Sequence, residues 1–305
     1  MRSWNEIAGV KVTNPVLLAA GVLGETYGSL KRVEFEGAGG LVTKSVGIRP
    51  NPGYPGPIVV EVEGGFLNAV GLANPGCKAF AEDIKEGIAE EPFRVPLIVS
   101  VYGSNSEEFA EVISRLEGIA DAFELNLSCP HSESFGLAVG SDPVVVGSIV
   151  AKSKEATSRP VFAKLSPNVN NIEEVAIAAE RAGADALVAI NTVGPGMSIE
   201  IESMRPVLSN KAGGLSGPCV KPIAVRCIYD IYESVEIPII GVGGVGSYED
   251  AVELMQAGAT WVQIGTALYG GVEKIFREIA EGVEKFLQRH RLSHSDLIGC
   301  AHGGF

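Results

Sequence analysis

The sequence lacks the features that place a chain in a membrane or direct it out of the cell. A membrane-spanning helix needs roughly 20 apolar residues, and the most apolar stretch near the N-terminus, residues 16–23, is far shorter. Residues 1–6 contain nothing like the apolar core of a signal peptide. We therefore expect a cytoplasmic protein with no membrane partner.

Positive charge and paired cysteines are also scarce. The 24 Lys and Arg residues stand against 37 Asp and Glu residues, giving a formal net charge of −13. Such a chain lacks the basic surface that binds a phosphate backbone, so we expect no nucleic-acid partner. The five cysteines form no CxxC pair and the histidines show no metal-ligand spacing, so we expect no metal site in this chain.

What the sequence does contain is a regular alternation of short apolar runs and amphipathic stretches. Continuous apolar runs that alternate with helices are typical of a parallel sheet covered on its outer face. The runs are at residues 16–19, 41–44, 97–102, 122–126, 161–165, 186–190, 239–242 and 261–264. The helical patterns are at residues 75–89, 106–116, 172–182, 220–232, 248–257 and 272–289.

The length and repeat of this pattern indicate a barrel. Gly37, Gly183 and Gly258 each end a helical pattern and lead directly into a strand, as C-capping glycines do. A (β/α)8 barrel needs roughly 250 residues, and this chain has 305. We predict one domain over residues 1–305, a (β/α)8 TIM barrel with a short N-terminal hairpin and inserted loops at its C-terminal face. A doubly wound open sheet is the alternative.

Polar or glycine residues fall at the carboxyl ends of six predicted strands. In a barrel these ends form the catalytic face, so the residues are expected to meet around one mouth. They are Lys44, Asn126, Lys164, Asn191, the pair Gly243-Gly244 and the pair Gly265-Thr266.

Cys129 is the candidate base. It lies just past the fourth predicted strand in Asn126-Leu127-Ser128-Cys129-Pro130, which opens an irregular stretch to about residue 143. Long irregular segments in compact domains are often binding loops. A cysteine at this place can have its pKa tuned so that it exchanges a proton near neutral pH. The competing interpretation is a buried structural cysteine.

The other mouth residues suggest an anionic, planar ligand with a phosphate. Lys164 closes an apolar strand and needs an anionic partner or a functional reason to be there, and a fixed cation stabilises a reduced flavin ring; Lys44 has a similar place. The glycine pairs after the last two strands are typical of a barrel phosphate site. Asn68, Asn126 and Asn191 supply amides that can bind a ring with C=O and N–H edges.

At these residues the sequence resembles dihydroorotate dehydrogenases, most closely those of class 1B. The similarity runs nearly end to end, and the motifs are specific as a set and weak singly. They are Ala19-Ala20-Gly21, Thr43-Lys44-Ser45, Asn68-Ala69-Val70-Gly71-Leu72, Asn126-Leu127-Ser128-Cys129-Pro130, Lys164-Leu165-Ser166-Pro167, Asn191-Thr192, Gly213-Gly214-Leu215-Ser216-Gly217-Pro218, Gly243-Gly244 and Gly265-Thr266.

The resemblance implies non-covalent FMN and oxidation of (S)-dihydroorotate to orotate in pyrimidine biosynthesis. Cys129 would remove the C5 proton while the C6 hydride passes to the flavin. The residues implied for FMN are Ala20, Lys44, Ser45, Ser100, Asn126, Lys164, Ile190, Gly217, Gly243, Gly244, Gly265 and Thr266. Those implied for the substrate are Lys44, Asn68, Ala69, Val70, Gly71, Leu72, Asn126, Asn191 and Thr192.

Class 1B is favoured by the segments 195–202 and 213–218. Membership of this class implies a homodimer that is paired with a second subunit. That subunit would carry FAD and a 2Fe-2S cluster and would reduce NAD. Cysteine at the base position agrees with class 1, because the membrane-associated class 2 has serine there. Ala20, Ser100 and His131 depart from the family pattern, which has serine, asparagine and asparagine there. These departures concern the expected flavin contacts and lid packing, and not the expected reaction.

Four other functions stay open at this point. A dihydropyrimidine dehydrogenase-like enzyme would act on uncharged rings such as dihydrouracil. A tRNA dihydrouridine synthase would share the barrel, flavin and cysteine, but the net charge of −13 disfavours it. A non-redox phosphate-binding lyase or isomerase would explain the glycine pairs and leave Lys164 and the asparagines without a role. A scaffold subunit would bind FMN only structurally.

Overall fold

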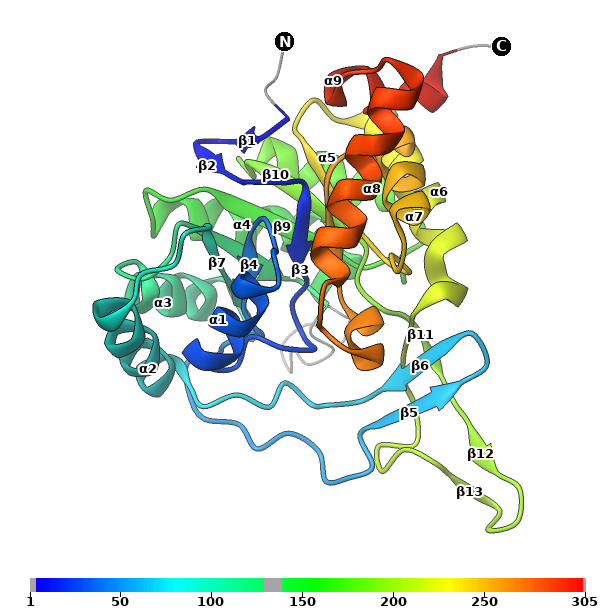
Figure 1. Cartoon of the computed structure of the whole chain (residues 1–305). Coiled ribbons are helices and arrows are strands. Elements are labelled where there is room, and N and C mark those ends of the chain that lie inside the picture. Colours follow the sequence, from blue (N-terminus) through cyan, green and yellow to red (C-terminus); the bar gives the residue numbers. More distant parts are fainter. Residues whose placement is uncertain (1–3, 129–138, 304–305) are drawn as a thin grey trace.

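A closed barrel of eight parallel strands forms the centre of the chain. The computed structural model describes residues 4–128 and 139–303. The strands follow the order β3-β16-β15-β10-β9-β8-β7-β4, and helices surround them (Figure 1). The barrel is closed between β3 and the residues just before β4. There the Gly39 N–H donates to the Val16 carbonyl at 2.8 Å, and the Leu18 N–H donates to the Gly40 carbonyl at 3.0 Å. The predicted (β/α)8 barrel is confirmed.

The barrel strands are β3 (Val16–Leu18), β4 (Leu41–Val42), β7 (Leu97–Val101), β8 (Ala122–Asn126), β9 (Val161–Leu165), β10 (Ala186–Ala189), β15 (Ile239–Val242) and β16 (Ala259–Ile264). The α-helices are α1 (Tyr27–Phe35), α2 (Cys77–Glu90), α3 (Ser106–Leu116), α4 (Pro143–Glu155), α5 (Ile172–Arg181), α6 (Lys221–Ser234), α7 (Tyr248–Ala257), α8 (Ile275–His290) and α9 (His294–Leu297). Short 3-10 helices lie at η1 (Val139–Ser141), η2 (Pro218–Val220), η3 (Thr266–Gly270) and η4 (Cys300–His302). Among the described residues, none of these helices is long and apolar enough to cross a membrane.

Apolar side chains fill the end of the barrel opposite its mouth. Alternate residues of a barrel strand point inward, and Ala122, Phe162 and Trp261 are inward residues that pack in one buried cluster. The N-terminal hairpin of β1 (Glu6–Ile7) and β2 (Val10–Lys11) adds Ile7 and Val10 to that cluster. The predicted hairpin therefore closes the end of the barrel opposite the mouth.

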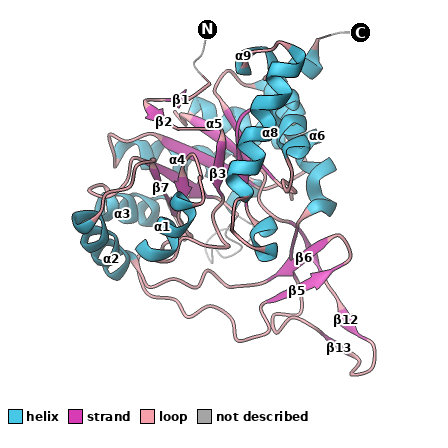
Figure 2. Ribbon diagram, viewed as in Figure 1, coloured by secondary structure: helices cyan, strands magenta, loops and turns pink. Residues whose placement is uncertain are grey.

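The insertions at the mouth form small sheets. Strands β11 (Val193–Gly196), β14 (Gly213–Ser216), β6 (Gly65–Asn68) and β5 (Val59–Val62) make a four-stranded antiparallel sheet in that order. Strands β12 (Ile199–Glu200) and β13 (Arg205–Pro206) form a two-stranded arm that projects from the body of the protein (Figure 2). Strand β1 and helix α9, the first and last of the strands and α-helices, lie at the other end of the molecule (Figure 1).

Three helices, α1, α4 and the four-residue α9, were not among the predicted helical patterns. Helix α4 begins at Asp142-Pro143, where the Asp142 carboxylate accepts a hydrogen bond from the Val144 N–H at 2.8 Å, and then runs through three consecutive valines. β-Branched residues have low helix propensity, so the local sequence signal is weak. Packing against α3 and α5 stabilises this helix instead.

Candidate active site

A cavity of about 560 Å³ opens at the carboxyl ends of the barrel strands. This volume lies within the range of about 300–1,000 Å³ that is usual for small-molecule sites. It is bordered by the strand-end residues and by the inserted sheet. The predicted residues that line it are Ala20, Lys44, Ser45, Asn68, Ala69, Val70, Gly71, Leu72, Asn126, Lys164, Ile190, Asn191, Thr192, Gly217, Gly243, Gly244, Gly265 and Thr266.

Cys129 falls outside the described residues. Ser128, which directly precedes it, lines the cavity, and its hydroxyl is buried with no hydrogen-bond partner among the described atoms.

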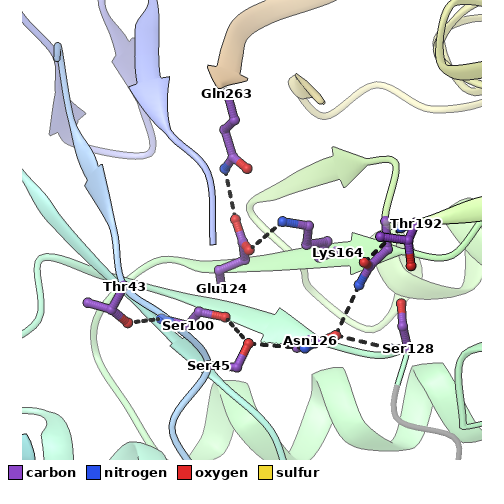
Figure 3. Close-up of polar contacts among 10 residues, drawn as sticks. Thr43, Ser45, Ser100, Glu124, Asn126, Ser128, Lys164, Thr192 and Gln263 are labelled. Carbon is purple, nitrogen blue, oxygen red and sulfur yellow. Dashed lines mark hydrogen bonds and ion pairs between the residues drawn. The ribbon is translucent and has the colours of Figure 1, made fainter. Parts of the chain in front are cut away.

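A row of hydroxyl and amide side chains crosses one side of the mouth (Figure 3). The Asn126 amide donates to Ser45 Oγ at 3.0 Å, and its own Oδ1 accepts from Asn191 Nδ2 at 3.2 Å. Ser45 Oγ lies 2.9 Å from Ser100 Oγ. Ser100 is fully buried and is not a lining residue, so it reaches the cavity only through Ser45.

A buried ionic group lies deeper in the barrel. Lys164 Nζ donates to Glu124 Oε1 at 3.1 Å, and Gln263 Nε2 donates to Glu124 Oε2 at 2.8 Å (Figure 3). Lys164 is 5% exposed and Glu124 is fully buried. A buried ammonium needs such a partner, so the expectation that Lys164 requires an anion is met by Glu124.

The second lysine of the mouth has a different partner. Lys44 Nζ forms an ion pair with Glu25, whose side chain is 57% exposed. An exposed carboxylate can turn to solvent at little cost, since surface ion pairs contribute only about 0–1 kcal/mol. Of Lys44 and Lys164, Lys44 is thus the one whose carboxylate partner an incoming anion can replace more easily.

Glycine-rich turns form the opposite side of the cavity. Gly217 precedes η2 and helix α6, while Gly243 and Gly244 follow β15. Gly244 has φ +75°, and a Cβ there would lie 2.6 Å from Lys221 Cβ. Only glycine fits this turn without strain. Backbone N–H groups at a helix N-terminus beside such turns are suited to bind a phosphate.

An ion pair fixes the glycine turn from outside. Asp250, in the first turn of α7, accepts from Lys221 Nζ at 2.7 Å, from the Gly246 N–H at 3.0 Å and from Ser247 Oγ at 2.9 Å. Burial raises the pKa of the Asp250 carboxyl, but these hydrogen bonds outweigh burial and lower its pKa overall. The carboxylate therefore stabilises the folded state above the usual carboxyl pKa of about 3.9. That stabilisation is lost as pH falls through the lower folded-state pKa.

Replacing Asp250 with alanine is expected to lower the free energy of unfolding by about 2 kcal/mol, since it removes a capping box and a hydrogen-bonded ion pair. It should also weaken binding of any phosphate held by the Gly243-Gly244 turn. Asp296→Ala is the matched control, because Ser293 and Asp296 form the same capping box on α9. Chemical denaturation measures the first effect in both variants. Equal phosphate-ligand affinity in the Asp250 and Asp296 variants would contradict the second.

Several cavity residues were not predicted from the sequence. Gln263 and Tyr269 line the cavity, and Glu124 holds Lys164 and Gln263 from within the barrel. Burial raises the pKa of Tyr269, whose ring lies 4.8 Å from that of Phe66. Strand alternation was the available signal for Glu124, which lies two residues before Asn126 and so faces the same side of β8.

Comparison with known proteins gives a consistent relationship over nearly the whole chain. The family model described as "Dihydroorotate dehydrogenase" matches residues 4–287. The protein named "Dihydroorotate dehydrogenase B (NAD(+)), catalytic subunit" from Methanothermobacter thermautotrophicus is 49% identical, with 97% of each chain covered. The protein of the same name from Pyrococcus furiosus is 50% identical, again with 97% of each chain covered. That from Methanosarcina mazei is 51% identical over 97% of this chain and 94% of its own.

Proposed function

Because this chain belongs to the dihydroorotate dehydrogenase family, we propose that it oxidises (S)-dihydroorotate to orotate in pyrimidine biosynthesis with FMN as its cofactor. The observation that carries the proposal is that a buried lysine, a row of amides and the glycine turns all line one cavity. A non-redox lyase or isomerase would need the glycine turns alone.

The cavity has the chemistry that FMN requires. Its buried Gln263 Oε1 has no hydrogen-bond partner among the described atoms, so a ring with an N–H group would satisfy it. The glycine turns after β15 and β16 would hold the phosphate, and Lys164 and Asn126 would contact the ring from the barrel side. Bound FMN would supply the hydride acceptor, which no amino-acid side chain provides.

The chain's own residues would bind the substrate and move its proton. Lys44 would pair with the carboxylate of dihydroorotate once Glu25 turns away. The substrate ring has C=O and N–H edges, which would be hydrogen-bonded by Asn68, Asn126 and Asn191. Each asparagine amide can donate to a ring C=O and accept from a ring N–H. Cys129, as thiolate, would take the C5 proton, the step for which a base of tunable pKa is suited.

Replacing Lys44 with methionine tests the substrate assignment. We expect KM for dihydroorotate to rise about tenfold or more, because a charge-assisted hydrogen bond contributes about 1.5–3 kcal/mol. Steady-state rates with an artificial electron acceptor should be measured for dihydroorotate and for dihydrouracil, which has no carboxylate. Wild-type protein that turns over dihydrouracil in preference to dihydroorotate would favour the dihydropyrimidine dehydrogenase-like alternative.

Cofactor identity is tested separately. The purified protein should be yellow, and heat denaturation should release a flavin whose mass is that of FMN. Release of FAD, or of no flavin from protein that retains dihydroorotate turnover, would contradict the assignment of FMN.

We also propose that the chain works as a homodimer with an electron-transfer subunit carrying FAD and a 2Fe-2S cluster. The relatives are named as catalytic subunits. The β12–β13 arm supports contact with another polypeptide, because Ile201 and Met204 are 82% and 85% exposed, and such exposed apolar groups often mark interfaces. Light scattering on the chain alone, and with the second subunit added, measures both associations.

A further inference from the structure

Glu124 is a buried carboxylate that the proposed reaction does not use. It lies on β8 and joins Lys164 on the neighbouring strand β9 to Gln263 on β16 (Figure 3). In the strand order β16 is four strands away from β8, on the opposite wall of the barrel. The carboxylate thus connects the two walls beneath the cavity.

The hydrogen bond to Glu124 determines which way the Gln263 amide points. A carboxylate only accepts hydrogen bonds, so the atom that Gln263 turns toward it must be Nε2. Oε1 is then directed away from Glu124, and it is buried with no donor among the described atoms. Gln263 lines the cavity and is 1% exposed. A buried amide oxygen without a donor is costly, which points to a donor on the molecule that the cavity binds.

Lys164 is oriented by the same carboxylate. Its ammonium has three protons, one of which is donated to Glu124 Oε1. Lys164 also lines the cavity. Glu124 therefore places a cationic donor and an amide acceptor together at the cavity floor. Their complement is a ring edge that carries a carbonyl beside an N–H group, as the pyrimidine part of a flavin does.

We propose that Gln263 is a further cofactor-binding residue, which accepts a hydrogen bond from the pyrimidine N–H of the flavin, and that Glu124 is the positioning residue for Gln263 and Lys164. This inference rests on the proposed function, because it takes a flavin as the occupant. Glu124 also cancels much of the Lys164 charge. A lone buried cation would stabilise the negative charge of the reduced flavin and hinder onward transfer of its electrons.

Glu124→Gln tests the charge effect in the FMN-loaded protein. The substitution keeps the size of the side chain and removes its charge. The midpoint potential of bound FMN, measured by spectroelectrochemistry, is expected to move to a more positive value. Asp121→Asn is the matched control. It changes a carboxylate immediately before the same strand, at the other end of the barrel, where Asp121 accepts a hydrogen bond from the Leu97 N–H at 2.8 Å. The control should keep the wild-type potential.

Gln263→Met tests the contact and leaves the pair of Glu124 and Lys164 in place. The dissociation constant of FMN is expected to rise about tenfold, the effect of one hydrogen bond. This variant tests the contact between Gln263 and the flavin even if Glu124→Gln does not fold. Wild-type FMN affinity in Gln263→Met would overturn the role of Gln263, and an unchanged potential in folded Glu124→Gln would overturn that of Glu124. Both results leave the proposed function standing, whereas wild-type protein that binds no FMN would refute the proposed function itself.

Discussion

Replacing Cys129 with serine is expected to lower kcat about 10²- to 10⁴-fold at neutral pH, the usual contribution of a general base. The physical reason is acidity. A thiol titrates near pH 8.5 in its unperturbed state and lower beside cations, while a serine hydroxyl stays protonated throughout the accessible pH range. FMN should remain bound, because the role proposed for Cys129 is removal of the substrate proton and not FMN binding.

The pH dependence separates a base from a structural cysteine. Wild-type kcat should rise with pH and level off once the thiol has ionised, whereas the residual rate of Cys129→Ser should continue to rise. Cys300→Ser is the control, since Cys300 is an exposed free thiol outside the cavity. Near wild-type rates in Cys129→Ser would refute the assignment. Full turnover in Cys129→Ala would favour the scaffold alternative.

Replacing Lys164 with alanine is expected to weaken FMN binding and slow flavin reduction. The substitution removes the cation that would stabilise the reduced ring. It also leaves the fully buried Glu124 carboxylate with Gln263 as its remaining side-chain partner among the described residues. Losing one member of a buried pair destabilises a protein by about 3–5 kcal/mol. Stopped-flow reduction and denaturant unfolding measure the two effects.

A double variant distinguishes lost stability from lost chemistry. Lys164→Met combined with Glu124→Gln removes both charges and should recover much of the stability, since an apolar or neutral replacement of a buried pair is often tolerated. Flavin reduction should stay slow, because the cation is still missing. Unchanged FMN affinity and reduction rate in Lys164→Ala would refute the role of Lys164.

The barrel could be predicted from the sequence because its strands are buried on both faces. Strands such as β9, all of whose residues are buried, appear as continuous apolar runs. The inserted sheet gave no such signal. Its strand β14 has the sequence Gly-Gly-Leu-Ser and β11 has Val-Gly-Pro-Gly, and glycine and proline are depleted in strands. Tertiary pairing with β6 makes β14 a strand.

The mouth residues could be predicted for a related reason. Each follows the carboxyl end of a predicted strand, and in a barrel these ends meet around one mouth. The pairing of Glu124 with Lys164 and with Gln263 could not be predicted. Glu124 precedes Lys164 by 40 positions, and Gln263 follows Glu124 by 139. These three side chains meet only when the barrel closes and opposite strands face each other. The local sequence around each of them does not indicate which distant residue it contacts.

The central claim is that this chain transfers hydrogen from dihydroorotate to its own flavin, and the half-reaction tests it most directly. Purified protein is mixed without oxygen with dihydroorotate, and separately with dihydrouracil, while the visible absorbance of the flavin is followed. Bleaching by dihydroorotate alone is the predicted result, and it needs no partner subunit. A bound flavin that dihydroorotate leaves oxidised would contradict the claim, and bleaching by dihydrouracil would then make an uncharged ring the substrate.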